Sequence, residues 1–215
     1  MLRKTCFLAF LLLLTAAFAA HADTIVLNPG NSSVAGQYTY MGTTYELSPY
    51  SGTLNGQAVS FICVDISQTV PAGGMWTANS TMLTNAANNY AGTVQGSGIV
   101  YLEMAYLATQ MVNNLAGGMV GAATADQFAI WSFTGGPDPF AISNPPFDTS
   151  SLDAQALAAV NGGFTVTGWQ ILTPVPGGEG QEMLVMPSSI PEPSSLLLIS
   201  TGLLGLAAVW AKRRG

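Results

Sequence analysis

Few side chains in this chain could do chemistry, and Cys63 is the most unusual of them. Every lysine and arginine of the 215 residues lies before residue 5 or after residue 211, and His21 is the sole histidine. Residues 23–190 therefore cannot supply a Ser-His-Asp triad, a Cys-His pair, a lysine base or a histidine-containing zinc site. One thiol and a set of carboxylates remain. We expect no enzyme, no cofactor and no metal site.

The acidic residues of 23–190 are scattered along the sequence, and the same segment contains no lysine, arginine or histidine. They are Asp23, Glu46, Asp65, Glu103, Asp126, Asp138, Asp148, Asp153, Glu179 and Glu182. A paired-carboxylate glycosidase stays conceivable, because carboxylates distant in sequence can meet in space. Glu179 and Glu182, in a Gly/Pro-rich segment, are predicted to lie in a solvated turn. Without Lys or Arg to displace counterions from phosphates, nucleic-acid binding is excluded.

Residues 1–22 have the three parts of a secretory signal peptide. Arg3-Lys4 form a basic region, 7–18 an apolar region, and Ala20-His21-Ala22 a cleavage site. Cleavage there predicts a mature chain that begins at Asp23 and has lost Cys6. The protein is therefore expected to be exported, with Cys63 as its only cysteine.

Residues 188–215 are predicted to be a linker and a C-terminal transmembrane sorting helix. Pro191, Glu192 and Pro193 precede the uncharged stretch 194–211. About 18 residues make about 27 Å of helix, which suffices to cross a hydrocarbon core. Lys212, Arg213 and Arg214 follow as a basic tip that should stay cytoplasmic.

This C-terminal pattern resembles the PEP-CTERM sorting signal of bacterial surface proteins. The resemblance implies that an exosortase, a membrane-embedded cysteine protease, is the processing partner and cuts near Pro191-Glu192-Pro193. The membrane helix would then be transient, and the protein would pass from an inner-membrane intermediate to the cell surface or the exopolysaccharide matrix. A plain C-terminal membrane anchor is the alternative.

Residues 23–187 are predicted to form one secreted α+β domain, antiparallel β-sheet-rich with a few packed helices. A chain of about 165 residues can bury one substantial core. Strands are expected over 24–27, 37–45, 59–66, 164–173 and 181–186, with Asn55-Gly56 as the strongest hairpin signal. Helices are expected over 99–115, 125–133 and 152–160. The first helix should end at Gly117-Gly118 and pack one face on the sheet.

Cys63 has three interpretations, because an unpaired thiol is unusual in an oxidising, exported compartment. Its apolar neighbours in 61–64 favour a buried, inert cysteine. An intermolecular disulfide is a second possibility. The third joins Cys63 to a motif later in the chain.

Three segments together resemble the bacterial surface thioester domains, which are adhesin modules. They are Phe61-Ile62-Cys63-Val64-Asp65, Met104-Ala105-Tyr106-Leu107-Ala108 and Asp126-Gln127-Phe128-Ala129-Ile130-Trp131. The resemblance implies that the Cys63 thiol attacks the side-chain carbonyl of Gln127, that ammonia leaves, and that an internal thioester remains. That thioester could acylate an amine on a partner surface.

Two features of this motif leave other roles open. Asp126 stands where the family has Thr, and a carboxylate beside the reacting amide disfavours a thiolate unless it points away. Thr124 to Gln127 also fits a capping box, in which Gln127 would bond to the start of a helix. Trp131 by itself is explained as a core aromatic.

Two functions remain in competition for the exported domain. One is covalent capture through Cys63 and Gln127, for which the absence of lysine would protect sibling copies from acylation. The other is a non-covalent structural or glycan-binding β-domain with an inert cysteine. Its sugar-stacking candidates are Tyr38, Tyr40, Tyr45, Tyr50, Trp76 and Trp169.

Overall fold

The computed structural model describes residues 22–28, 36–40, 42–66, 68, 73–134, 147–175 and 180–186. Residues 1–21 of the predicted signal peptide, the sorting motif Pro191-Glu192-Pro193, the span 194–211 and the basic tip lie outside these residues. Within the described residues, no helix has the length and apolar character needed to cross a membrane.

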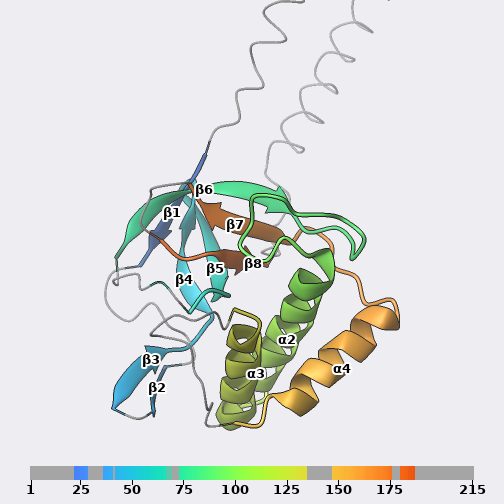
Figure 1. The fold of residues 1–215 in the computed structure, drawn as a ribbon. Helices are drawn as coiled ribbons and strands as arrows, with labels where there is room; N and C mark the ends of the chain where they lie inside the picture. Colours follow the sequence, from blue (N-terminus) through green and yellow to red (C-terminus); the bar gives the residue numbers. More distant parts are fainter. Residues whose placement is uncertain are drawn as a thin grey trace, which may run out of the picture.

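Six antiparallel strands close into a barrel in the order β1-β4-β5-β8-β7-β6. They are β1 (Asp23–Leu27), β4 (Tyr50–Leu54), β5 (Gln57–Cys63), β6 (Met75–Met82), β7 (Gln170–Pro174) and β8 (Met183–Val185). In Figure 1 the barrel forms one layer and three helices form a second layer beneath it. Closure pairs every strand on both sides, so the barrel has no free edge. The predicted α+β, antiparallel class is confirmed.

The hairpin between β4 and β5 forms at the predicted Asn55-Gly56. Both residues have positive φ, 51° at Asn55 and 79° at Gly56, as a two-residue hairpin turn with the right twist requires. The Asn55 side chain also accepts a bond from the Thr24 N–H at 2.9 Å and donates to Asp23 Oδ1 at 2.7 Å. One turn residue therefore joins the β4–β5 hairpin to the start of β1.

The predicted single strand over 37–45 is wrong. The chain instead forms a separate two-stranded hairpin from β2 (Gln37–Tyr40) and β3 (Thr43–Glu46). Gly42 has φ of 82°, which lets the chain reverse where an extended strand would continue. β5 likewise ends at Cys63, short of the predicted 66, and β6 was not predicted at all.

Three helices cover one side of the barrel: α2 (Gly98–Ala116), α3 (Val120–Ser132) and α4 (Ser150–Asn161). The predicted helix over 99–115 is confirmed as α2, and α3 begins five residues before the predicted 125. α2 packs against both other helices and shares a buried apolar cluster with barrel residues Ile62, Ile171 and Leu184. One face of α2 thus packs on the sheet as expected.

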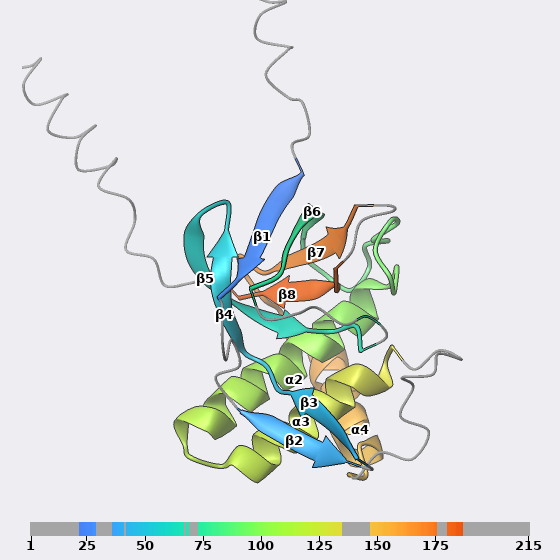
Figure 2. The same ribbon diagram turned by 90° about the vertical axis from the view of Figure 1, so that its left-hand side faces the viewer.

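A second buried cluster fills the barrel and extends to α3. It joins Phe61, Cys63 and Leu172 of the barrel to Phe128 and Trp131 of α3. The β2–β3 hairpin closes over this cluster, since Tyr38 and Tyr45 pack on Phe128 with ring centroids 5.6 and 6.0 Å apart (Figure 2). Cys63 and the α3 motif are therefore parts of one hydrophobic core.

We expect Gly52→Ala to destabilise the barrel strongly. A Cβ at Gly52 would lie 2.3 Å from the Val26 carbonyl oxygen and 2.9 Å from Phe61 Cε2, so backbone would have to move. Overpacking of this kind costs about 1–3 kcal/mol. The unfolding midpoint in urea should fall accordingly. Gly121→Ala in α3 is the control, because its Cβ would meet nothing within 4 Å and should leave the midpoint unchanged or raise it. Equal midpoints for the two variants would contradict the described packing.

Candidate functional site

Cys63 ends β5 with its side chain buried and its sulfur beside two acceptors. Its backbone N–H donates to Ser48 Oγ at 2.8 Å. The sulfur lies 3.4 Å from the carbonyl oxygen of Asp65 and 3.5 Å from Oε1 of Gln181. Cys63 is a free thiol with 1% of its surface exposed.

Gln127 lies on α3 with its side-chain amide against the backbone of Cys63. Its Nε2 donates to the Cys63 carbonyl oxygen at 3.1 Å, and its Oε1 accepts from the Ser48 backbone N–H at 3.1 Å. Gln127 is fully buried, and both the nitrogen and the oxygen of its side-chain amide are hydrogen-bonded. The two residues that the sequence motif nominated are thus neighbours in the fold, and Ser48 bonds to both.

The capping-box interpretation of Gln127 is wrong. α3 begins at Val120, so Thr124 lies inside the helix and its hydroxyl donates to the Val120 carbonyl oxygen at 2.8 Å. Gln127 is two turns into α3, where the backbone amides are already bonded within the helix. Its side chain is therefore available to reach across to β5.

The Asp126 carboxylate is hydrogen-bonded to a residue of α2. Its Oδ2 accepts from Asn114 Nδ2 at 2.7 Å across the α2–α3 contact. Burial raises the pKa of the Asp126 carboxyl from 3.8 to about 6, against the opposing effect of the Asn114 bond. The residue that departs from the family motif thus has a structural partner of its own.

Asp126→Asn should stabilise the protein at neutral pH and leave it unchanged in acid. Below 3.8 the carboxyl is protonated in the folded and unfolded states alike, so it costs nothing. As pH rises toward about 6, the unfolded state loses its proton first, and stability falls. Asn keeps an oxygen for Asn114 and never ionises. Thermal unfolding should show a Tm gain for the variant at pH 7 that vanishes near pH 4. A gain that is the same at both pH values would contradict the raised pKa.

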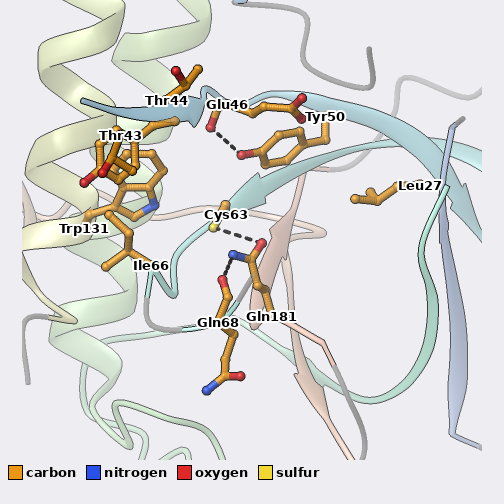
Figure 3. A pocket seen from close by; sticks show the side chains of 11 residues that line it. Leu27, Thr43, Thr44, Glu46, Tyr50, Cys63, Ile66, Gln68, Trp131 and Gln181 are labelled. Atoms are coloured by element: carbon orange, nitrogen blue, oxygen red, sulfur yellow. Dashed lines mark hydrogen bonds between the residues drawn. The ribbon is translucent and has the colours of Figure 1, made fainter. Parts of the chain in front are cut away.

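A pocket of about 230 Å³ opens beside Cys63 (Figure 3). The β3 strand, β4, the end of β5 and α3 supply most of its wall. It is lined by Leu27, Thr43, Thr44, Tyr45, Glu46, Tyr50, Cys63, Ile66, Gln68, Trp131 and Gln181. Glu46 is the one acidic side chain among them, and the Tyr50 hydroxyl donates to the Glu46 carbonyl oxygen at 2.6 Å. A small molecule or side chain in this pocket would meet the cysteine.

The Cys63 thiol is protonated at neutral pH. Burial raises its pKa to about 12, the indole of Trp131 opposes that rise, and the Asp65 charge adds to it. The thiolate is the nucleophilic form of cysteine. Any reaction at this sulfur must therefore remove the proton in a buried setting.

The predicted solvated turn is wrong for Glu182, and Glu179 lies outside the described residues. Glu182 is fully buried and accepts bonds from the Tyr101 hydroxyl, from Thr173 Oγ1 at 2.6 Å and from the Val94 N–H at 3.0 Å. These donors offset the loss of solvent, although burial still raises the carboxyl pKa. Glu182 joins β7, the start of α2 and the loop before it. Across the described part of the chain, no three His, Cys, Asp or Glu side chains gather as a metal site.

The aromatic residues suggested for sugar stacking mostly belong to the core. Tyr50, Trp76 and Trp169 are buried. Tyr38 and Tyr45 are cross-strand partners in the β2–β3 hairpin, and Tyr45 also packs on Trp131 at 5.9 Å. The described residues thus present no row of exposed rings for a glycan.

Sequence reasoning missed Ser48 and Gln181 as neighbours of Cys63. Ser48 precedes β4 in a stretch with no recognised motif, and its role depends on the β4–β5 pairing. Gln181 lies 118 residues after Cys63 in sequence. Only the pairing of β5 with β8 carries Gln181 to the cysteine.

The fold and site define an α+β barrel domain with a buried Cys-Gln pair beside a pocket. The C-terminal segment indicates how the protein is sorted, because residues 189–214 match the family described as the PEP-CTERM protein-sorting motif. The chain thus carries a PEP-CTERM sorting motif, which implies export, exosortase processing and a place at the cell surface or outside the cell. Searches of curated proteins and of solved structures found no match.

Proposed function

We propose that the exported domain is an adhesin-like module that attaches covalently through a thioester between Cys63 and Gln127. The carrying observation is the position of the Gln127 amide. This amide is fully buried and hydrogen-bonded to the backbone of the cysteine itself, and Ser48 bonds to both residues.

The chemistry follows from these contacts. The Cys63 sulfur attacks Cδ of Gln127, the Cδ–Nε2 bond breaks, and ammonia leaves with the thiol proton. The Ser48 N–H already bonds Oε1, so it is placed to stabilise the negative charge that develops on that oxygen. Loss of ammonia removes the donor to the Cys63 carbonyl oxygen and leaves the acyl group on the sulfur.

The pocket would admit the acceptor of the acyl group. An incoming amine attacks the thioester carbonyl, an amide forms, and Cys63 leaves as a thiol. Glu46 would attract an amine in its protonated form, and the aromatic walls of Tyr45 and Trp131 favour a cation near them. The amine then releases that proton to solvent before it attacks. A surface amine is therefore the proposed partner. Because residues 23–187 contain no lysine, the thioester of one copy of the domain could not acylate a lysine side chain of another copy.

A non-covalent extracellular β-domain is the second candidate, and the thiol pKa of about 12 favours it. A buried thiol that stays protonated behaves as a small hydrophobic side chain. In that case Cys63 would only pack within the hydrophobic core, and a polysaccharide would be the partner of the domain.

Methylamine treatment separates the two candidates. We expect it to release one alkylatable thiol at Cys63 and to leave a methylated amide on Gln127, because a thioester is a far better acyl donor than an amide. Peptide mass spectrometry reads both changes. A Cys63 thiol that can be alkylated after denaturation without any amine treatment would end the covalent proposal.

A further inference from the structure

The indole N–H of Trp131 is a buried donor without a normal hydrogen bond. Trp131 is 4% exposed, and its Nε1 has no partner within ordinary hydrogen-bond distance and angle. A buried donor without a partner has lost its hydrogen bonds to water without replacement, which destabilises the folded state. Phenylalanine would fill a similar space without carrying an N–H group.

The indole of Trp131 is oriented toward the cysteine. Trp131 and Cys63 line the same pocket, and Figure 3 shows the indole nitrogen on the side of the ring that faces the sulfur. The ring is held by edge contacts with Phe128, at 5.3 Å between centroids, and by Tyr45. The indole is also the strongest influence that favours the Cys63 thiolate over the thiol.

We propose that the Trp131 Nε1–H donates a hydrogen bond to the Cys63 sulfur when that sulfur carries negative charge. The inference rests on the proposed thioester function and adds a residue to it. The charge develops twice: when the thiol loses its proton to attack Gln127, and when an amine expels the sulfur from the thioester. In the resting thiol the N–H has no charged acceptor, which accounts for its unpaired state.

Trp76 provides a matched control. It is also buried, its Nε1 is likewise unpaired, and it belongs to the same core cluster as Trp131. Trp76 lies on β6 and does not line the pocket. Trp76→Phe therefore removes an equivalent N–H and a similar volume outside the pocket.

The test compares Trp131→Phe, Trp76→Phe and the unaltered protein, each as the mature processed form. We expect Trp131→Phe to slow the opening of the thioester by methylamine about tenfold, the effect of one weak bond to a charged group. Alkylation of the released thiol by iodoacetamide at fixed pH should slow by a similar factor, because less thiolate is present. Trp76→Phe should leave both rates unchanged.

The sign of the alkylation change separates a chemical role from a structural one. If Trp131 only fills space, the smaller phenylalanine opens the pocket and alkylation becomes faster. Rates for Trp131→Phe that equal or exceed those of the unaltered protein would overturn the inference. If the unaltered protein holds no thioester, the covalent proposal fails separately, and alkylation of its free thiol still decides whether Trp131 stabilises the thiolate.

Discussion

The mature protein is expected to weigh one ammonia less than its sequence, because the Cys63 sulfur replaces the amide nitrogen of Gln127. The Gln127 amide contacts the Cys63 backbone, and the Ser48 N–H polarises its carbonyl. Intact-mass spectrometry under non-reducing conditions measures the deficit directly. The effect is all or none in each molecule, which makes it the largest that the site predicts.

Three substitutions identify the atoms involved. Cys63→Ala and Gln127→Ala should each restore the full sequence mass, since neither residue can form the bond alone. Gln181→Ala is the matched control, because Gln181 also holds an amide near the sulfur, at 3.5 Å from Oε1. We expect Gln181→Ala to keep the deficit. Loss of the deficit in that variant alone would make Gln181 the acyl donor and would contradict the assignment to Gln127.

Exosortase processing should depend completely on Glu192. In a host that carries an exosortase, the envelope fraction is expected to contain a form that lacks 196–215, because the PEP-CTERM motif covers residues 189–214. Glu192→Ala removes the charged centre of the motif and should leave the full-length, membrane-embedded chain. Immunoblotting of envelope and released fractions measures the conversion.

Glu179→Ala is the control for this second experiment. It removes an acid that precedes the motif and should leave processing intact. A chain that stays full-length in an exosortase host without any substitution would show that the C-terminal segment acts as a plain anchor. Normal conversion of Glu192→Ala would show that the protease does not recognise that carboxylate.

Local signals in the sequence predicted the parts of the fold that depend on neighbouring residues. Asn55-Gly56 specified a turn because both residues accept positive φ, and the apolar spacing before Gly117-Gly118 specified α2. The strand β6, with the sequence MWTANSTM, was not predicted because its apolar and polar residues do not alternate regularly. Closure of the barrel depends on the pairing of β1 with β6, which no local pattern encodes.

The candidate site was predictable only where a motif marked it. The resemblance nominated Cys63 and Gln127, and the fold places them together. Glu182 was misjudged because a Gly-rich context suggests solvent, whereas its three donors come from segments as far as 88 residues away. Ser48 and Gln181 were not predicted for the same reason, because their contacts with Cys63 join segments that are distant in sequence. Trp131 was explained as a core aromatic, which is true of its ring and leaves its N–H unexplained.

The direction of β1 and β5 sets how the domain would be displayed on a cell. Asp23 and Met186, near the two ends of the exported domain, line one open hollow together with Gln57. From Gln57, β5 runs six residues to Cys63, about 20 Å at the usual rise of a strand. β1 likewise runs from Asp23 to Leu27 at the Cys63 pocket. A chain held through its C-terminus would thus present the cysteine end outward. If the signal peptide is cleaved after Ala22, as predicted, the α-amine of Asp23 would stay near the tether, away from the cysteine end of the barrel.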